Sequence, residues 1–241
     1  MLTLFSGPLS MFGAKVQIAA LEKGIAFELV MVPFDRDDRY LPLHPEVARI
    51  NPKNQVPVLI DTSVSDGPLE LFDSTQLFEY LEDLKPEPAL WQSGIAARAH
   101  TRQLELKSDE VFFPHVIKLF GLQDDMQSAA AQAACAGCAA FYEYLEALLA
   151  GKDYLAGGYS YADIAFYVAQ TYAERKGALM TTATPRLMAW RERVGRRPAV
   201  VEVIAPMMQF LASQNRGVPL HLQHLLHETV PHRPQQPRSD A

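Results

Sequence analysis

Short apolar runs alternate with amphipathic stretches over the first 84 residues of the chain. Four runs are short and rich in apolar residues, as strands are, while three stretches show the spacing of helices. The predicted strands are residues 2–6, 27–32, 56–61 and 69–73, and the predicted helices are residues 11–23, 46–50 and 74–84. Their order, β-α-β-α-β-β-α, predicts a parallel first pair of strands with a right-handed crossover, and a hairpin across the Asp66–Gly67 turn.

The pattern changes after residue 84. Residues 85–92 begin with KPEPAL, whose two prolines favour a linker. Strand patterns almost disappear beyond it, and helical patterns are found at residues 95–120, 125–149, 160–175, 184–195 and 199–212. We therefore expect an α/β domain over residues 1–84 and an all-helical domain over residues 93–213. Residues 214–241 are polar and rich in proline, and are expected to form a mobile tail.

Two motifs that could carry chemistry are better explained by packing. Cys135 and Cys138 form a C-x-x-C motif, but the residues around it predict the middle of an alanine-rich helix rather than the strand-to-helix junction of a redox pair. We interpret both as small packing residues. Ser160 and Asp163 are spaced as a capping box, which begins the helix over residues 160–175.

The charge and hydropathy of the chain limit its partners. There are 22 basic and 28 acidic residues, so the net charge is −6, which argues against nucleic acid or an anionic membrane as the main partner. No apolar run is long enough to span a bilayer, and the N-terminus has no signal peptide pattern, so a cytoplasmic location is expected. No second pair of ligands accompanies the cysteines, and no metal site is predicted.

Candidate chemistry is concentrated where predicted strands meet other elements. Ser10 lies between the first strand and the first helix, where it could cap the helix or contact a substrate. Val56–Pro57 begins a strand, and its peptide bond could be trans, as most are, or cis. Asp73 and Ser74 end a strand and begin a helix; they could form an N-cap, or hold the ammonium and carboxylate of a small zwitterion.

Five segments, taken together, resemble the bacterial kind of cytosolic glutathione transferase. They are SMFGAKVQIAALEKGI, NPKNQVPVLID, LFDSTQLFEYLED, GYSYADIAFY and TPRLMAWRERVGRRPAV, and they lie in the family's order. The resemblance covers residues 1 to about 212. It implies a thioredoxin-like N-terminal domain that binds glutathione and an all-helical C-terminal domain that contributes the second substrate pocket.

The resemblance also implies which residues hold glutathione. The Val56–Pro57 bond would be cis, and the main chain of Val56 would pair with the cysteinyl part of the peptide. Asp73 and Ser74 match the acidic residue and serine that hold the γ-glutamyl end, although the family more often has glutamate at the first position. Lys53 and Gln55 lie where family members contact the peptide near its glycyl carboxylate.

Ser10 matches the position of the family's catalytic serine. A free thiol has a pKa of about 8.5, so little of it is thiolate at neutral pH. A hydroxyl that donates a hydrogen bond to sulfur at a helix N-terminus would stabilise the thiolate. Ser6 is a nearby hydroxyl that competes for this role. Thiol–disulfide exchange is disfavoured because no cysteine occupies position 10.

The resemblance predicts a glutathione S-transferase that adds the glutathione thiolate to small apolar electrophiles and works as a homodimer. A glutathione-dependent isomerase or dehalogenase would use the same thiolate, and a non-catalytic binding protein of this fold is the alternative from another class. The acceptor pocket is expected at Met11 and Phe12 and on the helix that carries Phe112, His115 and Leu119, which share one face at helical spacing.

Overall fold

The computed structural model describes residues 1–35 and 39–229, which divide into two compact units. The first unit comprises residues 1–88, residues 202–215 and the described residues after 223; the second comprises residues 89–201 and 216–223. The long segment of the first unit ends at Pro88, inside the predicted linker. Residues 202–213 were expected in the helical domain, but the structure groups them with the first unit.

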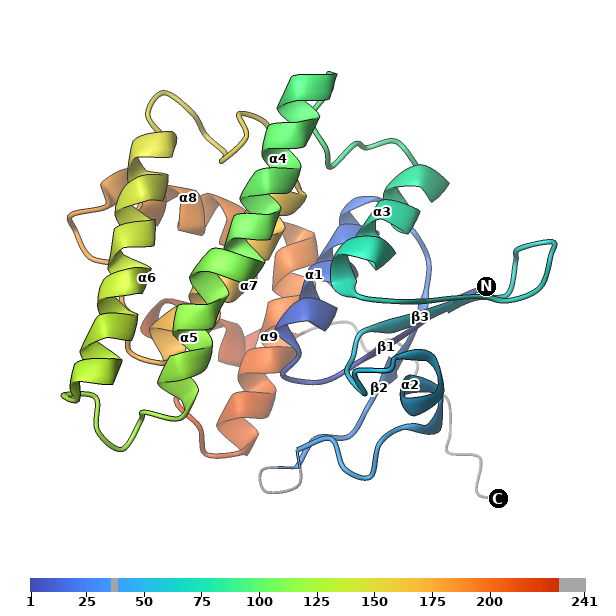
Figure 1. Cartoon of the computed structure of the whole chain (residues 1–241), viewed down its shortest axis with the longest axis horizontal. Coiled ribbons are helices and arrows are strands. Elements are labelled where there is room, and N and C mark those ends of the chain that lie inside the picture. Colours follow the sequence, from blue (N-terminus) through green and yellow to red (C-terminus); the bar gives the residue numbers. More distant parts are fainter. Residues whose placement is uncertain (36–38, 230–241) are drawn as a thin grey trace. The chain divides into compact units, whose positions relative to one another are not determined.

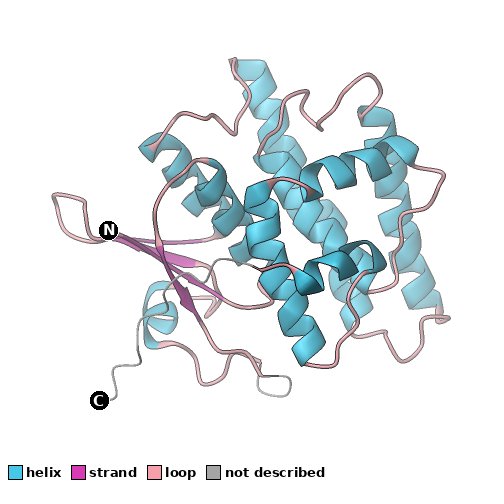
Figure 2. Cartoon of the chain, turned by 180° about the vertical axis from the view of Figure 1, so that it is seen from behind, coloured by secondary structure: helices cyan, strands magenta, loops and turns pink. Residues whose placement is uncertain are grey.

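The first unit contains one mixed sheet, whose strands are gathered together in Figure 2. The strands are β1 (Leu2–Ser6), β2 (Glu28–Met31), β3 (Val58–Asp61) and β4 (Leu69–Phe72), in the order β2-β1-β3-β4. β1 is parallel to β2 and antiparallel to β3, and β3 and β4 form an antiparallel hairpin. The predicted parallel pair and hairpin are therefore confirmed.

Helices cover both faces of this sheet because the strand residues alternate in direction. Leu4 of β1 and Leu59 of β3 pack with Val16 of α1 (Met11–Glu22) and Leu77 of α3 (Ser74–Leu84). Figure 1 shows α1 and α3 side by side. The intervening strand residues, such as Phe5 and Val58, pack instead with Val47 of α2 (Pro45–Ile50). The first unit thus has the three-layer order of a thioredoxin-like domain.

The described part of the second unit is helical, apart from its turns and two isolated bridges near residue 156. Its helices are α4 (Ile95–Lys107), η1 (Ser108–Phe112), α5 (Phe113–Phe120), α6 (Ala129–Leu148), α7 (Tyr161–Arg175) and α8 (Pro185–Gly195). α7 is the core element, because every residue from Tyr161 to Ala173 is buried. α9 (Pro198–Ser213) begins in the second unit and continues into the first.

The helix predicted over residues 95–120 is interrupted in the structure. α4 passes into a single turn of π-helix, η1, before α5 begins. Pro114 explains the interruption, because it has no N–H to give to the carbonyl of Glu110 and its ring would clash there. A wider π turn accommodates such a position within a helix. The turn shifts the helix register between α4 and α5, while Phe112, His115 and Leu119 lie at its end or beyond it.

The beginning of α7 confirms the predicted capping box. The Asp163 carboxylate accepts hydrogen bonds from the N–H and hydroxyl of Ser160, at 2.9 and 2.8 Å. It also accepts from the Leu155 N–H at 2.9 Å and from the Trp190 indole at 2.8 Å. One buried carboxylate therefore joins the loop before α7 to α8. 

Cys135 and Cys138 lie within α6, as predicted. Cys138 is buried and Cys135 is partly exposed. Burial raises the pKa of the Cys138 thiol to about 12, so this thiol is protonated at neutral pH. Its place in the helix and its protonation agree with a packing role.

The expectation of a mobile tail from residue 214 is wrong for part of that segment. Residues Leu220–His227 form a 3₁₀ helix, η2, in which Leu222 and Leu225 are each 2% exposed. A 3₁₀ helix has three residues per turn, so this spacing places both leucines on one face. His221 lies 2.8 Å from Glu174 of α7. Residues 230–241, the rest of the predicted tail, lie outside the described residues.

Candidate functional site

The register of the sheet brings the predicted glutathione-binding residues to one end of the sheet. Phe5 near the end of β1 pairs with Val58 at the start of β3, and Val58 pairs with Phe72 at the end of β4. The turn after β1, the loop before β3 and the junction after β4 therefore meet at the same end of the sheet. These three segments carry Ser10, Val56–Pro57 and Asp73–Ser74 respectively.

Ser10 is the N-cap of α1. Its main chain is extended, with φ −89° and ψ 110°, and its Oγ accepts a hydrogen bond from the Gly13 N–H at 2.9 Å. The cap uses a lone pair of Oγ and leaves the hydroxyl proton for another acceptor. The hydroxyl also lies at the positive end of the α1 dipole. One side chain can thus cap the helix and donate to a ligand sulfur at the same time.

Ser6 is more deeply buried than Ser10, with exposed fractions of 0% and 7%. Its side chain is completely buried and its Oγ accepts a hydrogen bond from Gln17 Nε2 at 3.0 Å. A Cβ at Gly13 would lie only 2.0 Å from Ser6 Oγ, so the tight approach of α1 to β1 requires glycine at that position. Ser6 therefore belongs to the support of the turn.

The loop before β3 presents its side chains outward. Lys53 and Gln55 are exposed, Val56 is partly buried, and the Val56–Pro57 peptide bond is cis. Among the described residues, no hydrogen bond uses the main-chain N–H or C=O of Val56. Both groups are available to pair with an extended peptide.

Asp73 has a main-chain conformation that is rare for a residue other than glycine, with φ 76° and ψ 124°. Its Oδ1 accepts hydrogen bonds from the N–H groups of Thr75 and Gln76, at 3.1 and 3.4 Å, so Asp73 is the N-cap of α3. Two of the N–H groups that could have held a ligand carboxylate are therefore occupied. Oδ2 of this exposed side chain has no hydrogen bond to a described residue and can accept from a ligand ammonium. Ser74 begins the helix beside it.

Comparison with known proteins identifies the family. A family model described as "Glutathione S-transferase, N-terminal domain" matches residues 4–89, and one described as "Glutathione S-transferase, C-terminal domain" matches residues 108–198. The chain belongs to the glutathione S-transferase family. The turn after β1, the loop before β3 and the junction after β4 all lie within the part that matches the N-terminal domain of this family.

Relatives of different kinds share this similarity. The stringent starvation protein A homologue of Haemophilus influenzae is 32% identical over 117 residues, 48% of this chain and 50% of that protein. The chain thus spans about half the length of this curated relative. The glutathione S-transferase GstB of Escherichia coli is 28% identical over 161 residues, 64% of this chain and 76% of that protein. A glutathione transferase structure from Burkholderia graminis, with two glutathione molecules bound per subunit, is 28% identical with a TM-score of 0.71, covering 84% of this chain and 87% of that one.

The helical residues expected in the acceptor pocket of this glutathione S-transferase family member are placed differently. Phe112 and Leu119 are completely buried, and the Phe112 ring packs against Phe141 and Phe166 at centroid distances of 5.3 and 4.9 Å. The ring of His115 lies where a Cβ on Gly137 of α6 would be, at 2.4 Å. Phe112 and Leu119 therefore lie in the core of the second unit rather than at a pocket surface. Phe112 and His115 both pack toward α6, which agrees with the predicted common face. Met11 is 3% exposed and Phe12 is partly exposed.

Two residues that support the loops at this end of the sheet were not predicted from the sequence. Asn51 is 3% exposed, and its side chain bonds to both Lys53 and Gln55 within the loop before β3. The Asn51–Pro52 pair, a common turn dipeptide, was the available signal. Tyr40 lies over the turn after β1, where its ring comes within 2.4 Å of a Cβ placed on Gly7. Burial raises the pKa of Tyr40 to about 12, so its hydroxyl keeps its proton at neutral pH.

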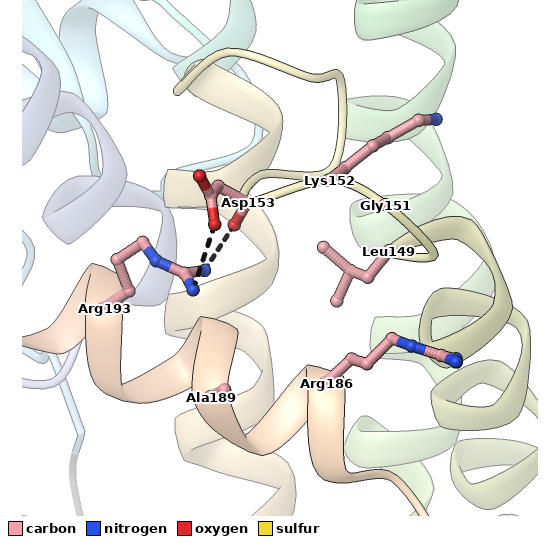
Figure 3. A pocket seen from close by; sticks show the side chains of 7 residues that line it. All are labelled: Leu149, Gly151, Lys152, Asp153, Arg186, Ala189 and Arg193. Atoms are coloured by element: carbon pink, nitrogen blue, oxygen red, sulfur yellow. Dashed lines mark hydrogen bonds and ion pairs between the residues drawn. The ribbon is translucent and has the colours of Figure 1, made fainter.

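A separate surface cavity of about 340 Å³ lies within the second unit, between the end of α6 and α8 (Figure 3). It contains no residue predicted for the site. Arg193 is paired with Asp153 at 3.2 Å, and Arg186 with Glu146 at 3.3 Å. The charged ends of Lys152 and Arg186 lie apart in Figure 3, so its cations do not converge on one ligand group. We assign no ligand to this cavity.

Over residues 1–35 and 39–229, no group of three or more His, Cys, Asp or Glu side chains is arranged to hold a metal ion. In the same part of the chain, no helix has the length and apolar character needed to cross a membrane.

Proposed function

We propose that this chain is a glutathione S-transferase that activates the glutathione thiol for attack on small apolar electrophiles. The observation that carries the proposal is that Ser10, the Val56 main chain and Asp73 meet at one end of the sheet. The helix cap made by Ser10 uses its oxygen and leaves its hydroxyl proton for a ligand. The glutathione bound to the related Burkholderia graminis structure supports the choice of ligand.

Glutathione binding is divided among the three segments. The N–H and C=O of Val56 pair with the cysteinyl residue in the manner of an added strand, while Lys53 and Gln55 lie toward the glycyl end. Asp73 Oδ2 accepts from the γ-glutamyl ammonium, and Ser74 lies beside the γ-glutamyl carboxylate. The strained conformation of Asp73 agrees with this role, since such strain tends to be retained at ligand sites.

Thiol activation needs no general base in the protein. The Ser10 hydroxyl donates to the sulfur, and this hydrogen bond with the α1 dipole favours the thiolate, so the thiol proton passes to solvent. With an aryl halide, the sulfur electron pair forms a bond to the ring carbon, and the halide leaves with the electrons of its bond to that carbon. An isomerase or dehalogenase would begin from the same thiolate.

Two assays on the purified chain test the proposal. The chain should be retained on immobilised glutathione, be released by free glutathione, and then conjugate glutathione to a generic aryl halide. Failure to bind glutathione at all would overturn the proposal.

The similarity to the stringent starvation protein A homologue favours a second candidate, a binding protein of this fold without turnover, because that relative is not named as a transferase. Retention on glutathione without conjugation of any of several electrophiles would support this candidate over the first.

We also propose that two copies of the chain pair, as the family resemblance implies. Ile95, Val111 and Ile117 are 93%, 50% and 54% exposed, and burial of such side chains would favour association. Sedimentation should give a mass of about twice the 26.9 kDa of one chain, and a mass of one chain at micromolar concentration would contradict pairing.

A further inference from the structure

The loop from α2 to β3, residues 51–57, is buried at both ends and exposed in the middle, next to Val56, where the proposed glutathione peptide would pair. Lys53, Asn54 and Gln55 are all exposed, and few side chains of the sheet or helices pack over them. A free loop of this kind would lose conformational entropy with each residue that becomes ordered on binding a ligand. A loop that is already held in shape avoids that loss.

Asn51 is the residue that holds this loop. Its side chain is buried, with 3% exposure, although it lies at the exposed end of α2. Nδ2 donates to the Gln55 carbonyl at 2.6 Å, and Oδ1 accepts from the Lys53 N–H at 2.9 Å. The Asn51 carbonyl accepts from the Asn54 N–H at 2.8 Å, which closes the loop from its main chain as well.

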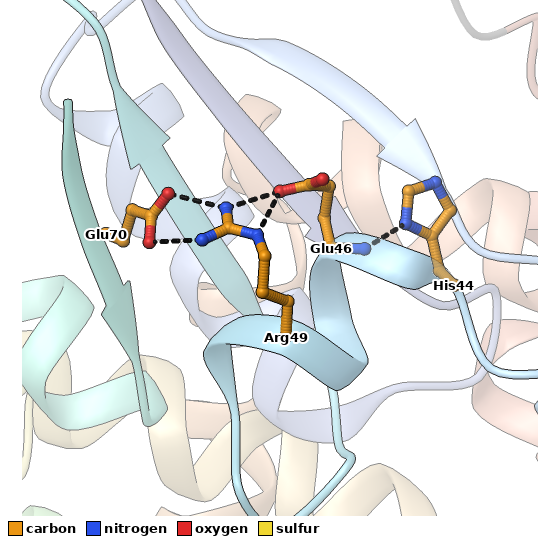
Figure 4. Close-up of polar contacts among 4 residues, drawn as sticks. All are labelled: His44, Glu46, Arg49 and Glu70. Atoms are coloured by element: carbon orange, nitrogen blue, oxygen red, sulfur yellow. Dashed lines mark hydrogen bonds and ion pairs between the residues drawn. The ribbon is translucent and has the colours of Figure 1, made fainter.

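The start of the loop is itself anchored to the sheet. Arg49 of α2 donates from Nη1 to Glu70 of β4 at 2.8 Å and from Nε to Glu46 at 3.2 Å, as Figure 4 shows. The Asn51 N–H continues the helix by donating to the Val47 carbonyl at 2.9 Å. The Asn51 side chain therefore transmits a fixed position from β4 and α2 to the residues just before Val56.

We propose that Asn51 is a positioning residue, whose side-chain amide holds the main chain of Lys53 and Gln55, and through them Val56, in the conformation that pairs with glutathione. This inference rests on the proposed glutathione site. Two functions are required of the side chain, an acceptor for Lys53 and a donor for Gln55, and an amide supplies both. A carboxylate at this position would still accept from the Lys53 N–H, but it would place an oxygen against the Gln55 carbonyl oxygen, and the two would repel each other.

The test compares Asn51→Asp with Asn54→Asp by calorimetric titration with glutathione and by steady-state kinetics. Both variants add one negative charge to the same loop, but the Asn54 side chain has no hydrogen bond to any described residue, and aspartate tolerates its φ of 55°. We expect Asn51→Asp to weaken glutathione binding about tenfold, the typical effect of losing one buried hydrogen bond. Asn54→Asp should bind within about twofold of the unmodified chain, within the variation of a surface substitution.

The kinetic readout separates positioning from general stability. For Asn51→Asp, KM for glutathione should rise about tenfold while kcat at saturating glutathione and KM for the aryl halide stay unchanged, because Ser10 lies on another segment. The ratio of its glutathione affinity to that of the unmodified chain at the same pH should also return toward one at low pH, where the introduced carboxyl is protonated and can donate to Gln55 as the amide does. Asn51→Ala, which adds no charge, should show the same rise in KM without recovery at low pH.

Three results would overturn the inference: unchanged glutathione binding in Asn51→Asp, an equal loss in Asn54→Asp, or a fall in kcat without a rise in KM for glutathione. If the unmodified chain itself does not bind glutathione, the proposed function fails first. If it binds and Asn51→Asp binds equally well, only the positioning role of Asn51 fails.

Discussion

Single residues at the end of the sheet use one side-chain atom to cap a helix and another for the proposed ligand. Ser10 caps α1 with an oxygen lone pair and keeps a proton to donate, and Asp73 caps α3 with Oδ1 and keeps Oδ2. The structural and functional roles of these residues are therefore separable. Substitutions that change one atom of the side chain should change one role and leave the other.

Asp73→Asn tests this separation. The amide oxygen can still cap α3, and asparagine is as good an N-cap as aspartate, so the free energy of unfolding should change little. The charge that would attract the ligand ammonium is lost, and glutathione affinity should fall tenfold to about a hundredfold, as for a charge-assisted hydrogen bond. Titration calorimetry and urea unfolding measure the two effects; equal glutathione affinity would remove Asp73 from the site.

Gly13→Ala tests the support beneath Ser10. The added methyl group would lie 2.0 Å from Ser6 Oγ, so Ser6 or α1 must move. Overpacking of this kind costs about 1–3 kcal/mol, which urea unfolding should detect. Gly217→Ala is the matched control, since a Cβ there meets nothing within 4 Å, and it should unfold at the urea concentration of the unmodified chain. Unchanged stability of Gly13→Ala would show that the turn has room to adjust.

At the scale of elements, α1 and α3 are joined by a buried ion pair. Lys23 Nζ lies 2.7 Å from Glu82 Oε2 and donates to the Pro88 carbonyl at 2.8 Å, and the two side chains are 0% and 11% exposed. Removal of Lys23 takes from the largely buried Glu82 carboxylate the cation that lies 2.7 Å from it. Such a change is far more costly than the net value of the pair.

Lys23→Met should therefore lower the free energy of unfolding by about 3–5 kcal/mol. The double variant Lys23→Met/Glu82→Leu should recover most of this loss, because neither charge of the pair remains buried. A double-variant cycle in urea measures both values. If the single variant were as stable as the unmodified chain, the pair would contribute nothing to the packing of α1 on α3.

The elements that were predicted correctly have a strong local pattern. The strands and helices of residues 1–84 follow from period and turn signals, and so does the α7 capping box. The π turn before Pro114 and the 3₁₀ helix over Leu220–His227 were not foreseen, because each lies in a segment whose composition suggests something else. Ser10 and Asp73 were predicted as site candidates because each stands between a strand and a helix, and the structure confirms their alternative role as N-caps. The contacts of Asn51 lie within one loop, which periodicity does not reveal.

For the molecule as a whole, stability should depend on pH through Asp163. Burial raises the pKa of this carboxyl to about 6 from its ordinary 3.8, so the folded chain binds its proton more tightly than the unfolded chain does. The contribution is fully present below pH 3.8 and is lost as pH rises through about 6. At about 1.36 kcal/mol per pKa unit, the loss is about 3 kcal/mol.

Asp163→Asn removes this titration and keeps a side chain of the same shape. Its free energy of unfolding should lack the fall of about 2 kcal/mol between pH 4 and pH 7 that Asp163 gives the unmodified chain. Urea unfolding of both proteins at pH 4 and pH 7 measures how much the free energy of unfolding of each one changes with pH. The other titrating groups are common to both proteins, so their effects cancel in the comparison. Parallel pH profiles would contradict a raised pKa for Asp163.

The central claim, that Ser10 stabilises the thiolate of bound glutathione, is tested most directly by the ultraviolet absorbance of the thiolate as pH is varied. With the unmodified chain, bound glutathione should titrate well below the pKa of about 8.5 of a free thiol. With Ser10→Ala, glutathione should still bind through Val56 and Asp73, but its thiol should titrate close to the free value, and each unit of that change corresponds to about 1.36 kcal/mol. The same low thiol pKa in both proteins would contradict the account and leave Ser10 as a helix cap alone.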